Sequence, residues 1–404
     1  MSKLPSIALR NLSRQARRTA LSAGSVLIAV CAVVLLRGMA NGLLRLLADN
    51  VVDAGVGAIQ VHAPGFLEAE SDPLKLDLPD EPALYARIAA VPGVAAVTPR
   101  LTFDALIGNG SVSTLAQVVA VDPAREAKVC PHRWDEAHGQ GLDKPDAAEA
   151  VVGEGLGTGL GAKAGDTLNI MTGTRAGAQN ALDFTVRTLM VTADPFSSKR
   201  RVIVPLKFAQ SVAGMGGRVT EIAIAVRDSS AVETVAARLS AELGPKYDVR
   251  TWKVLVPSVQ ERLVRLGRVL AFISVVLFIM VLSGIVNTML MTVYERVREI
   301  GTMLAVGAKR RQIVALFMLE AAGLGAVGAS AGGIIGYAFI RWLGARGIAL
   351  PIPGQAFSLE LHASVSFAYV LGAIGVGVVG ALVAAAYPSW RASRLTPVEA
   401  LRAI

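Results

Sequence analysis

Four segments of this chain are long and apolar enough to cross a lipid bilayer as helices. They contain no charged residue and cover residues 20–36, 269–293, 321–340 and 363–390. A helix needs about 20 predominantly apolar residues to span the hydrocarbon. The first segment is shorter, but it continues beyond Arg37, whose long side chain can carry its charge to the interface. We therefore predict an integral membrane protein with four transmembrane α-helices, the last three at about 269–293, 313–341 and 364–388.

Charge is scarce and unevenly placed. Only 18% of the residues are charged, against about 25% in soluble proteins. The net charge of +9 reflects basic residues next to the apolar segments, namely Lys3, Arg10, Arg14, Arg17, Arg18, Arg296, Arg298, Lys309, Arg310, Arg311, Arg391, Arg394 and Arg402. Because basic residues concentrate on the cytoplasmic side of a membrane, we predict cytoplasmic N- and C-termini. The arginines follow the span ends, which argues against nucleic acid as a partner.

The segment between the first two spans is expected outside the membrane as an α+β domain. Its strand-like stretches are 57–63, 94–107, 114–122, 184–194, 201–206 and 221–226, and its helical ones are 81–91 and 230–243. We predict three parts, namely 1–47, a periplasmic domain at 48–265, and 266–404. Within the domain we predict a membrane-near lobe of 48–110 with 215–265, and an insert lobe of 111–214.

No motif in the chain indicates catalysis, a bound cofactor or a metal. The glycine-rich run 153–165 lacks the Walker A pattern, because Ala162 and Ala164 flank its lysine. The run is instead expected to form a short helix and a turn. The group of Cys130, His132, Asp135 and His138 matches no zinc spacing. Cys31 lies within a span and Cys130 outside the membrane, so no internal disulfide is expected.

Two ionisable residues and a glycine pattern stand out within the spans. Glu320 and Arg37 are candidate functional polar groups, because ionisable side chains are rare inside a bilayer. Glu320 can equally serve the structure near the interface. The third span carries small residues four apart, which favour close helix contact, at Gly328, Gly332 and Gly336. The partner helix is not evident from the sequence.

The first two spans carry bulky aliphatic and aromatic side chains with few polar atoms. They can face lipid, or they can line an apolar cavity for a hydrophobic substrate, and the sequence does not decide between these. The candidate substrate-facing residues are Val33, Leu36, Phe272, Val276 and Ile279.

A short charged segment separates the second and third spans. Within 294–308 and just before it, Val293, Val297, Ile300 and Leu304 recur at helical spacing and form one apolar stripe. The charged residues Glu295, Arg296, Arg298 and Glu299 lie off that stripe. Gly301 allows close approach of another surface, and Gly307 is placed to end the helix. We predict a short amphipathic helix that presents its charges to a partner in the cytoplasm.

The same segment resembles the signature of the FtsX-like permease family of ABC transporters, which reads roughly E-R-x-R-E-I-G-x-x-x-A-x-G-A. The matching residues are Glu295, Arg296, Arg298, Glu299, Ile300, Gly301, Ala305, Gly307 and Ala308. The family's C-terminal pattern is matched by Pro388, Arg391, Ala392, Pro397, Glu399, Ala400, Leu401 and Arg402. Residues 149–168 resemble a segment of the MacB-type periplasmic domain shared by macrolide-exporter and lipoprotein-releasing permeases.

This resemblance implies a coupling helix at 294–308 that sits in a groove of a separate cytoplasmic ABC ATPase dimer. The residues expected to couple are Glu295, Arg296, Arg298, Glu299, Ile300, Gly301, Leu304, Gly307 and Ala308. The partner would use ATP and Mg, and this chain would bind no cofactor. The resemblance also implies a second permease, identical or related, and the bacterial inner membrane as the location.

The layout resembles lipoprotein-releasing (LolC/LolE-type) permeases, so we expect mechanical extraction of a hydrophobic substrate, with a periplasmic chaperone or adaptor as a further candidate partner. One alternative is a macrolide- or peptide-exporter-type permease with an adaptor and an outer-membrane channel. Another is a non-transporting permease that controls a cell-wall hydrolase. The sequence names neither the substrate nor the second permease.

Overall fold

The computed structural model describes residues 16–67, 73–137, 140–190, 195–351 and 358–394. The chain divides into two units. The helical unit comprises Met1–Leu46, Val264–Ala349 and Glu360–Ile404, and the sheet domain comprises Leu47–Leu263 and Leu350–Leu359. The boundaries predicted at 47/48 and 265/266 lie next to these, and the short segment Leu350–Leu359 joins the sheet domain in addition.

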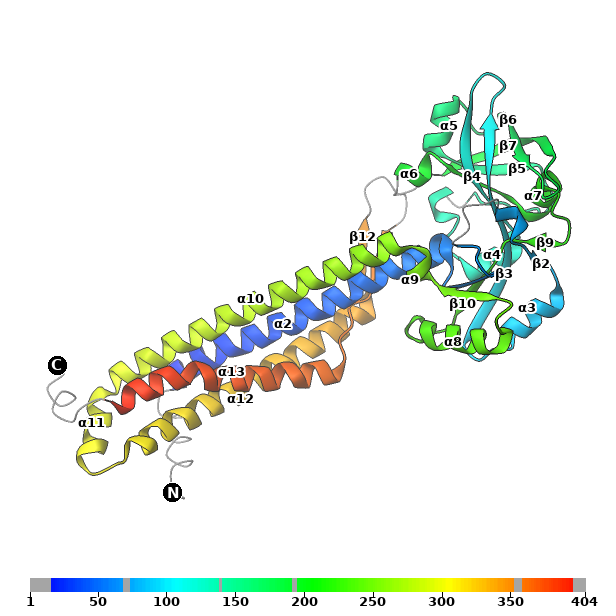
Figure 1. Cartoon of the computed structure of the whole chain (residues 1–404). Helices are drawn as coiled ribbons and strands as arrows, with labels where there is room; N and C mark the ends of the chain where they lie inside the picture. The colour runs from blue at the N-terminus through cyan, green and yellow to red at the C-terminus, as the bar shows by residue number, and fades with distance from the viewer. Residues whose placement is uncertain (1–15, 68–72, 138–139, 191–194, 352–357, 395–404) are drawn as a thin grey trace. The chain divides into compact units, whose positions relative to one another are not determined.

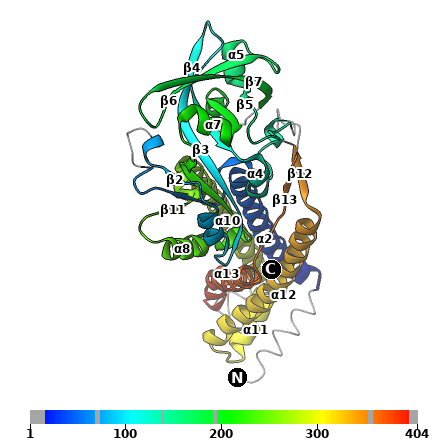
Figure 2. The same cartoon turned by 90° about the vertical axis from the view of Figure 1, so that its right-hand side faces the viewer.

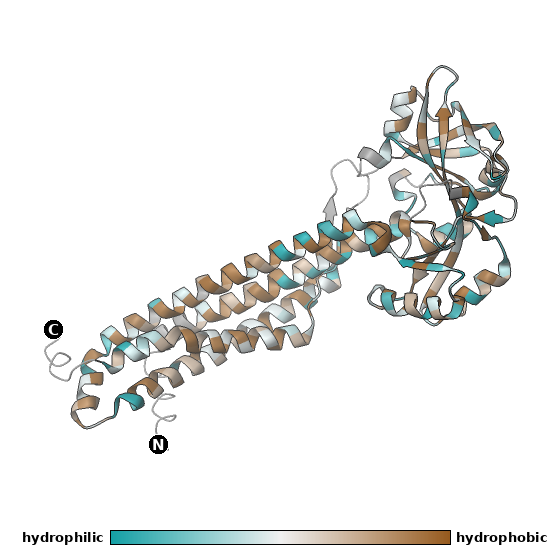
Figure 3. Ribbon diagram, in the orientation of Figure 1, coloured by the Kyte–Doolittle hydropathy of each residue, from teal (hydrophilic) through white to brown (hydrophobic). Residues whose placement is uncertain are grey.

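In the part of the chain that the structure describes, four helices are long and apolar enough to cross a membrane, as predicted (Figure 1). They are α2 (Ala16–Val51), α10 (Pro257–Glu295), α12 (Arg310–Arg346) and α13 (Phe367–Ser393). Hydrophobic residues dominate the middle of all four ribbons (Figure 3). A short helix, α11 (Val297–Ala305), connects α10 to α12.

The helix ends differ from the limits of the uncharged runs. The second helix begins at Pro257 rather than near 269, since proline suits a first turn and charged residues do not interrupt a helix. The fourth begins at Phe367 because Ser366 caps it, its hydroxyl accepting a bond from the Tyr369 amide at 3.3 Å. This helix continues through Pro388 to Ser393.

The glycines of α12 bring three helices close together. A Cβ atom at Gly328 would lie 2.6 Å from the Ala23 carbonyl of α2, and one at Gly332 would meet the Leu27 carbonyl. Gly336 also faces α2, next to Cys31 and Val34, while Gly325 and Gly333 face α13. Helices approach this closely only where side chains are absent. The structure therefore gives the predicted glycine pattern a partner, which is the first span.

The sheet domain is built on nine strands in the order β11-β1-β10-β3-β4-β8-β5-β7-β6. Their bounds, in chain order, are β1 (Ile59–His62), β3 (Val94–Gly108), β4 (Ser113–Val121), β5 (Glu149–Gly153), β6 (Thr167–Gly173), β7 (Gln179–Met190), β8 (Arg201–Pro205), β10 (Glu221–Val226) and β11 (Asp248–Thr251). Two small sheets pair β2 (Leu78–Pro79) with β9 (Arg218–Val219), and β12 (Ile348–Pro351) with β13 (Ser358–Leu361).

The long strand β3 belongs to two parts of this sheet. Its first half, up to Arg100, pairs with β10, and its second half, from Arg100 on, pairs with β4. An additional pairing of Leu106–Gly108 with β6 closes β3, β4, β8, β5, β7 and β6 into a ring. The predicted lobe boundary at 110/111 is therefore wrong, because half of β3 belongs to the ring. Residue alternation identified the strand but could not show that its two halves have different neighbours.

Short helices cover the sheet domain (Figure 2). Those near the β11-β1-β10-β3 part are α3 (Pro82–Ala89), α4 (Pro123–Val129), α8 (Val232–Leu243) and α9 (Trp252–Leu255), and those near the ring are α5 (Glu154–Leu160), α6 (Pro195–Ser198) and α7 (Leu206–Ala213). The glycine-rich run forms α5 and a turn, as predicted, with Gly161 at φ +65° ending the helix.

We predict that Gly332→Leu destabilises the helical unit, because the new side chain meets the backbone of Leu27 in a closely packed interface. Overpacking of this kind costs about 1–3 kcal/mol. The matched control is Gly375→Leu, since nothing lies within 4 Å of a Cβ atom at Gly375. Thermal unfolding of the purified chain in detergent measures both. Equal melting temperatures for the two variants would contradict the close α2–α12 contact.

Candidate functional site

The connection between α10 and α12 carries a short, separately capped helix. Arg296 leaves the helical conformation (φ −102°, ψ 13°), and this separates α11 from α10. At the other end Gly307 adopts φ +98°, where the amide of Ala308 bonds the Met303 carbonyl at 2.9 Å. A left-handed glycine is a common helix stop. The sequence predicted both the helix and its end.

The apolar stripe of this segment faces the helical unit. Val293 and Ile300 are buried with Ile313 and Phe317 of α12 and with Ala392 of α13. The partly buried residues of the same cluster are Met303, Leu304 and Ala308. Burial of this face holds α11 against the ends of two spans, so α11 cannot shift freely without them.

The opposite face of α11 is open. The side chains of Glu295, Arg298, Glu299 and Thr302 are exposed, and Val306 is 90% exposed. This face therefore offers charged groups and one apolar side chain to its surroundings. Ile300 and Gly301 were assigned to ATPase coupling together with the charged residues. The structure buries both, so they hold the helix in place and do not form its outer surface.

Arg296 and Glu320 form an ion pair at the base of the helical unit. The Arg296 Nη1 atom donates to Glu320 Oε1 at 3.0 Å and to Oε2 at 3.2 Å. Its Nε atom donates to Glu299 at 2.9 Å. Glu320 lies within α12 and is only 5% exposed. The pair therefore joins the start of α11 to the third span, and Arg296 faces inward, contrary to its predicted outward position.

An apolar groove of about 420 Å³ lies between three spans of the helical unit. Its walls come from α2, α10 and α13, and include Val26, Val30, Val33, Val275, Phe278, Leu282, Tyr369, Ala373 and Val376. One turn beyond Val33, the exposed Arg37 places its guanidinium 5.5 Å from the centre of the Tyr369 ring. The groove thus has apolar walls and a cation beside one end.

The candidate substrate-facing residues are placed differently from the prediction. Val33 lines the groove, whereas Leu36, Phe272, Val276 and Ile279 do not. Phe272 and Ile279 are 69% and 58% exposed on the outer face of α10. The groove takes the adjacent face of this helix, with Val275 and Phe278. A uniformly apolar helix gives no sequence signal for which face is enclosed.

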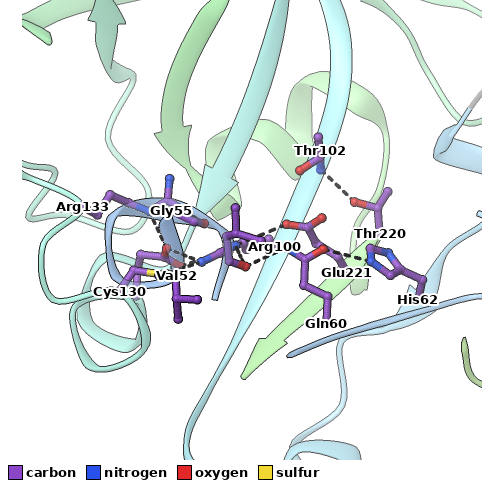
Figure 4. A network of polar contacts seen from close by, with 12 residues as sticks. Val52, Gly55, Gln60, His62, Arg100, Thr102, Cys130, Arg133, Thr220 and Glu221 are labelled. Carbon is purple, nitrogen blue, oxygen red and sulfur yellow. Dashed lines mark hydrogen bonds and ion pairs between the residues drawn. The ribbon is translucent and has the colours of Figure 1, made fainter. Parts of the chain in front are cut away.

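A buried network of charges holds the end of the first helix. Beyond Val51, α2 continues as one π-helical turn, η1 (Val52–Val56). Figure 4 shows the groups that converge on its carbonyls. Arg100 Nη1 donates to Val56 at 3.1 Å and Arg133 Nη2 to Gly55 at 2.6 Å. Carbonyls at a helix end have no intrahelical partner and carry partial negative charge, so cations suit them.

One carboxylate balances the two arginines. Glu126 of α4 accepts from Arg100 at 2.7 and 3.1 Å and from Arg133 at 2.5 Å. Arg100 is 1% exposed and Glu126 fully buried, and Glu221 lies 3.7 Å from Arg100. Burial alone would raise the pKa of Glu126, but the two arginine charges more than offset this, so its pKa is lowered. Glu126 therefore stays ionised at neutral pH.

Cys130 belongs to this network. Its thiol donates to the Val52 carbonyl at 3.3 Å, and burial raises its pKa. His132 bonds Asp135 at 2.8 Å near the surface, and His138 lies outside the described residues. Among the described residues no three possible metal ligands gather.

Comparison with known families decides the class of protein. The MacB-like periplasmic core domain matches residues 19–242, more than half of the chain. The FtsX-like permease C-terminal domain matches residues 271–397. This chain is an FtsX-like permease with a MacB-like periplasmic core domain. The sheet domain of the permease is therefore its periplasmic domain. The C-terminal residues of the predicted family pattern, from Pro397 on, lie outside the described part of the structure.

Curated relatives of this permease are exporters. It is 25% identical to the macrolide export ATP-binding/permease protein MacB of Brucella abortus over 99% of the chain, and 27% identical to that of Nitrobacter winogradskyi over 95%. It is also 25% identical to the pyoverdine export ATP-binding/permease protein PvdT of Pseudomonas entomophila over 95%. The chain spans 60%, 58% and 57% of the length of these three relatives.

Among solved structures, the periplasmic region of MacB from Actinobacillus actinomycetemcomitans is similar over 53% of this chain and 97% of that one. The TM-score is 0.34 and the sequence identity 12%.

Sequence reasoning missed the two charged networks of this permease. Arg100 sits in a strand-like run, and Glu126 and Arg133 sit in a polar stretch for which the sequence predicts neither strand nor helix. Nothing local distinguishes a buried arginine from an exposed one. Alternation gives no signal either, because it places Arg100 on the same strand face as Thr102 and Asp104, which is typical of a polar face. Glu320 was found, but Arg296 was not recognised as its partner.

We predict that Glu126→Gln destabilises the periplasmic domain by about 3–5 kcal/mol, because it leaves two buried arginines without a carboxylate. Glu149→Gln is the control: Glu149 also pairs with an arginine, Arg187, but is partly exposed, and such pairs contribute about 0–1 kcal/mol. Urea unfolding of the full chain in detergent provides the comparison. A similar loss of unfolding free energy in both variants would mean that the buried network stabilises the domain no more than a partly exposed ion pair.

The lowered pKa of Glu126 also predicts a pH dependence. The unfolded chain binds a proton at Glu126 below about pH 4.3, whereas the folded domain keeps it ionised, so stability rises with pH in this range. The stabilisation is complete at neutral pH and is lost as pH falls below about 4.3. The difference in stability between wild type and Glu126→Gln should therefore shrink on acidification, and a constant difference would exclude this ionisation as its source.

We predict that Glu320→Gln loosens α11 while Glu299→Gln does not. Both residues bond Arg296, but Glu320 is buried and Glu299 is 62% exposed at its side chain. Loss of the buried acceptor should raise amide exchange in 297–305 about ten-fold. The exchanged pair Arg296→Glu with Glu320→Arg should restore protection. Hydrogen exchange of the purified chain measures the protection of 297–305. The prediction is wrong if the double variant with swapped charges exchanges as fast as Glu320→Gln.

Proposed function

We propose that this permease is the membrane subunit of an ABC transporter of the bacterial inner membrane, driven by a separate cytoplasmic ATPase. The observation that carries the proposal is the geometry of α11. This helix is fixed on one side by a buried apolar cluster and an ion pair, and presents charged groups and Val306 on the other. Such a helix can transmit a displacement from a partner to the spans, because its inner face is packed and ion-paired against them.

Residues 1–404 contain no Walker A pattern, so we place ATP hydrolysis outside them and propose a separate ATPase as its source. ATP and Mg are then used by that partner. In this topology both termini and α11 face the cytoplasm. A pair of ATPase subunits closing on ATP would move α11 of each permease, and a second permease, identical or related, would complete the complex. The exposed apolar face of α10, with Phe272, Ile279 and Met280, offers a surface to that second permease or to lipid.

Motion of α11 has two routes to the periplasmic domain. One is covalent, through α10, which begins at Pro257 in that domain. The other passes from Arg296 to Glu320 of α12, and from the α12 glycines to α2. The end of α2 is held in turn by Arg100 and Arg133 of the periplasmic domain. We infer that ATPase closure is converted by these routes into a movement of the periplasmic domain.

The substrate is proposed to be hydrophobic or amphiphilic and to be taken from the outer leaflet or the periplasm. A lipoprotein fits the predicted layout, and a periplasmic chaperone would then receive it. The names of the relatives support a second candidate, a small exported compound such as a macrolide or a siderophore, with an adaptor and an outer-membrane channel as partners. Purification of the complex from native membranes, with identification of bound proteins, separates the two.

The outer face of α11 yields a direct test. Arg298→Glu and Val306→Asp should each weaken ATPase binding about ten-fold, since they place a wrong charge or a polar group in the contact. Arg341→Glu, at the other end of α12, changes the net charge equally and serves as control. The measurement is recovery of the ATPase with the tagged permease, followed by its ATP hydrolysis rate. Normal binding in both α11 variants would refute the proposed contact.

A further inference from the structure

The apolar groove has the length of one leaflet of a bilayer. Along α10 it extends from Ser274 to Ile285, which is about 16 Å at 1.5 Å per residue. The hydrocarbon of a bilayer is about 30 Å thick, so one leaflet supplies about 15 Å. A chain that enters the groove from one leaflet can therefore fill it without crossing the midplane.

The groove offers few hydrogen-bonding groups to a ligand. Of the residues that line it, only Ser274 and Tyr369 carry polar side-chain atoms, and the Ser274 hydroxyl already donates to the Leu270 carbonyl at 2.9 Å. Gly372 keeps the α13 wall open, because nothing lies within 4 Å of a Cβ atom built there. A polar ligand would lose its hydration here without replacement, whereas an aliphatic chain would not.

One end of the groove carries positive charge. Arg37 follows the groove residue Val33 by one turn of α2 and stacks over Tyr369, which itself lines the groove. The first turn of α13 begins at Phe367, close to that ring, and a helix N-terminus adds partial positive charge. From Arg37, α2 continues towards the periplasmic domain, so this end belongs to the outer leaflet of the membrane.

We propose that the groove and Arg37 bind an anionic glycerophospholipid of the outer leaflet, with one acyl chain in the groove and the phosphate at Arg37. The bilayer supplies this ligand at high concentration, its chain length matches the groove, and its charge matches the arginine. The site goes beyond the proposed transport function, because the lipid is a resident ligand that is independent of the exported substrate. The bound lipid would contact α2, α10 and α13, the three helices that line the groove.

Two glycines of α13 allow a matched test of the acyl-chain site. Neither Gly372 nor Gly375 has an atom within 4 Å of a built Cβ, but only Gly372 lines the groove. The Gly372→Leu side chain should fill the groove and remove the bound lipid, whereas Gly375→Leu should retain it. The measurement is native mass spectrometry of the full chain released from nanodiscs of phosphatidylglycerol and phosphatidylethanolamine. Equal lipid retention in the two variants overturns the proposal.

The head-group preference is tested at Arg37. Wild type should retain phosphatidylglycerol over phosphatidylethanolamine, and Arg37→Gln should lower this ratio about five-fold, the effect of one basic residue at an anionic surface. Arg45→Gln, an exposed arginine two turns further along α2, should leave the ratio unchanged. An unchanged ratio in Arg37→Gln, or an equal fall in Arg45→Gln, overturns the assignment of the phosphate to Arg37.

A third measurement does not depend on any variant. Added phosphatidylglycerol should raise the melting temperature of the delipidated wild-type chain more than phosphatidylethanolamine does, because a ligand that binds only the folded state stabilises it. Equal effects of the two lipids contradict the proposal. The proposal is also contradicted if the purified protein carries a protein-attached acyl chain in the groove in place of a free phospholipid. None of these readouts requires the ATPase, so failure here leaves the proposed function standing.

Discussion

The carbonyl groups at the end of α2 set the main constraint on this permease. A helix that leaves a membrane ends in carbonyls without intrahelical partners, and here the last turn, η1, is half-buried in the periplasmic domain. Arg100 and Arg133 donate to the carbonyls of Val56 and Gly55, whereas the Val52 carbonyl accepts from the Gly57 amide and from the Cys130 thiol. Two arginines cannot be buried for this purpose without a counterion, which explains Glu126 at the same place. The turn that follows the first span is therefore held within the periplasmic domain by a charge-balanced network.

Non-covalent contacts within the helical unit link α11 to α2. In sequence, α2 is separated from α11 by the whole periplasmic domain, so among the described residues a direct influence of α11 on α2 must pass through non-covalent contacts. The ion pair of Arg296 with Glu320 and the glycine face of α12 supply them. Both contacts are close and buried, and buried contacts transmit displacement better than loose ones because tightly packed interiors compress little.

The sequence predicted the parts of the fold that depend on local pattern. The four spans, the main strands and α11 with its stop at Gly307 follow from apolar runs, alternation and one glycine. It did not predict partners. The two neighbours of β3, the helix facing Gly332, and the enclosed face of α10 each depend on which distant segment lies alongside. A uniformly apolar helix has no periodicity from which its buried face can be read, and so Phe272 was chosen where Val275 lines the groove.

The coupling surface and the groove share no residue. The outer face of α11 and the pair Arg296–Glu320 occupy one end of the bundle, and the groove is lined by other positions of α2, α10 and α13. Substitutions in the groove can therefore alter what the permease holds without changing how it is driven. In the proposed function, the outer face of α11 receives the mechanical input, while the groove walls need only remain apolar and packed.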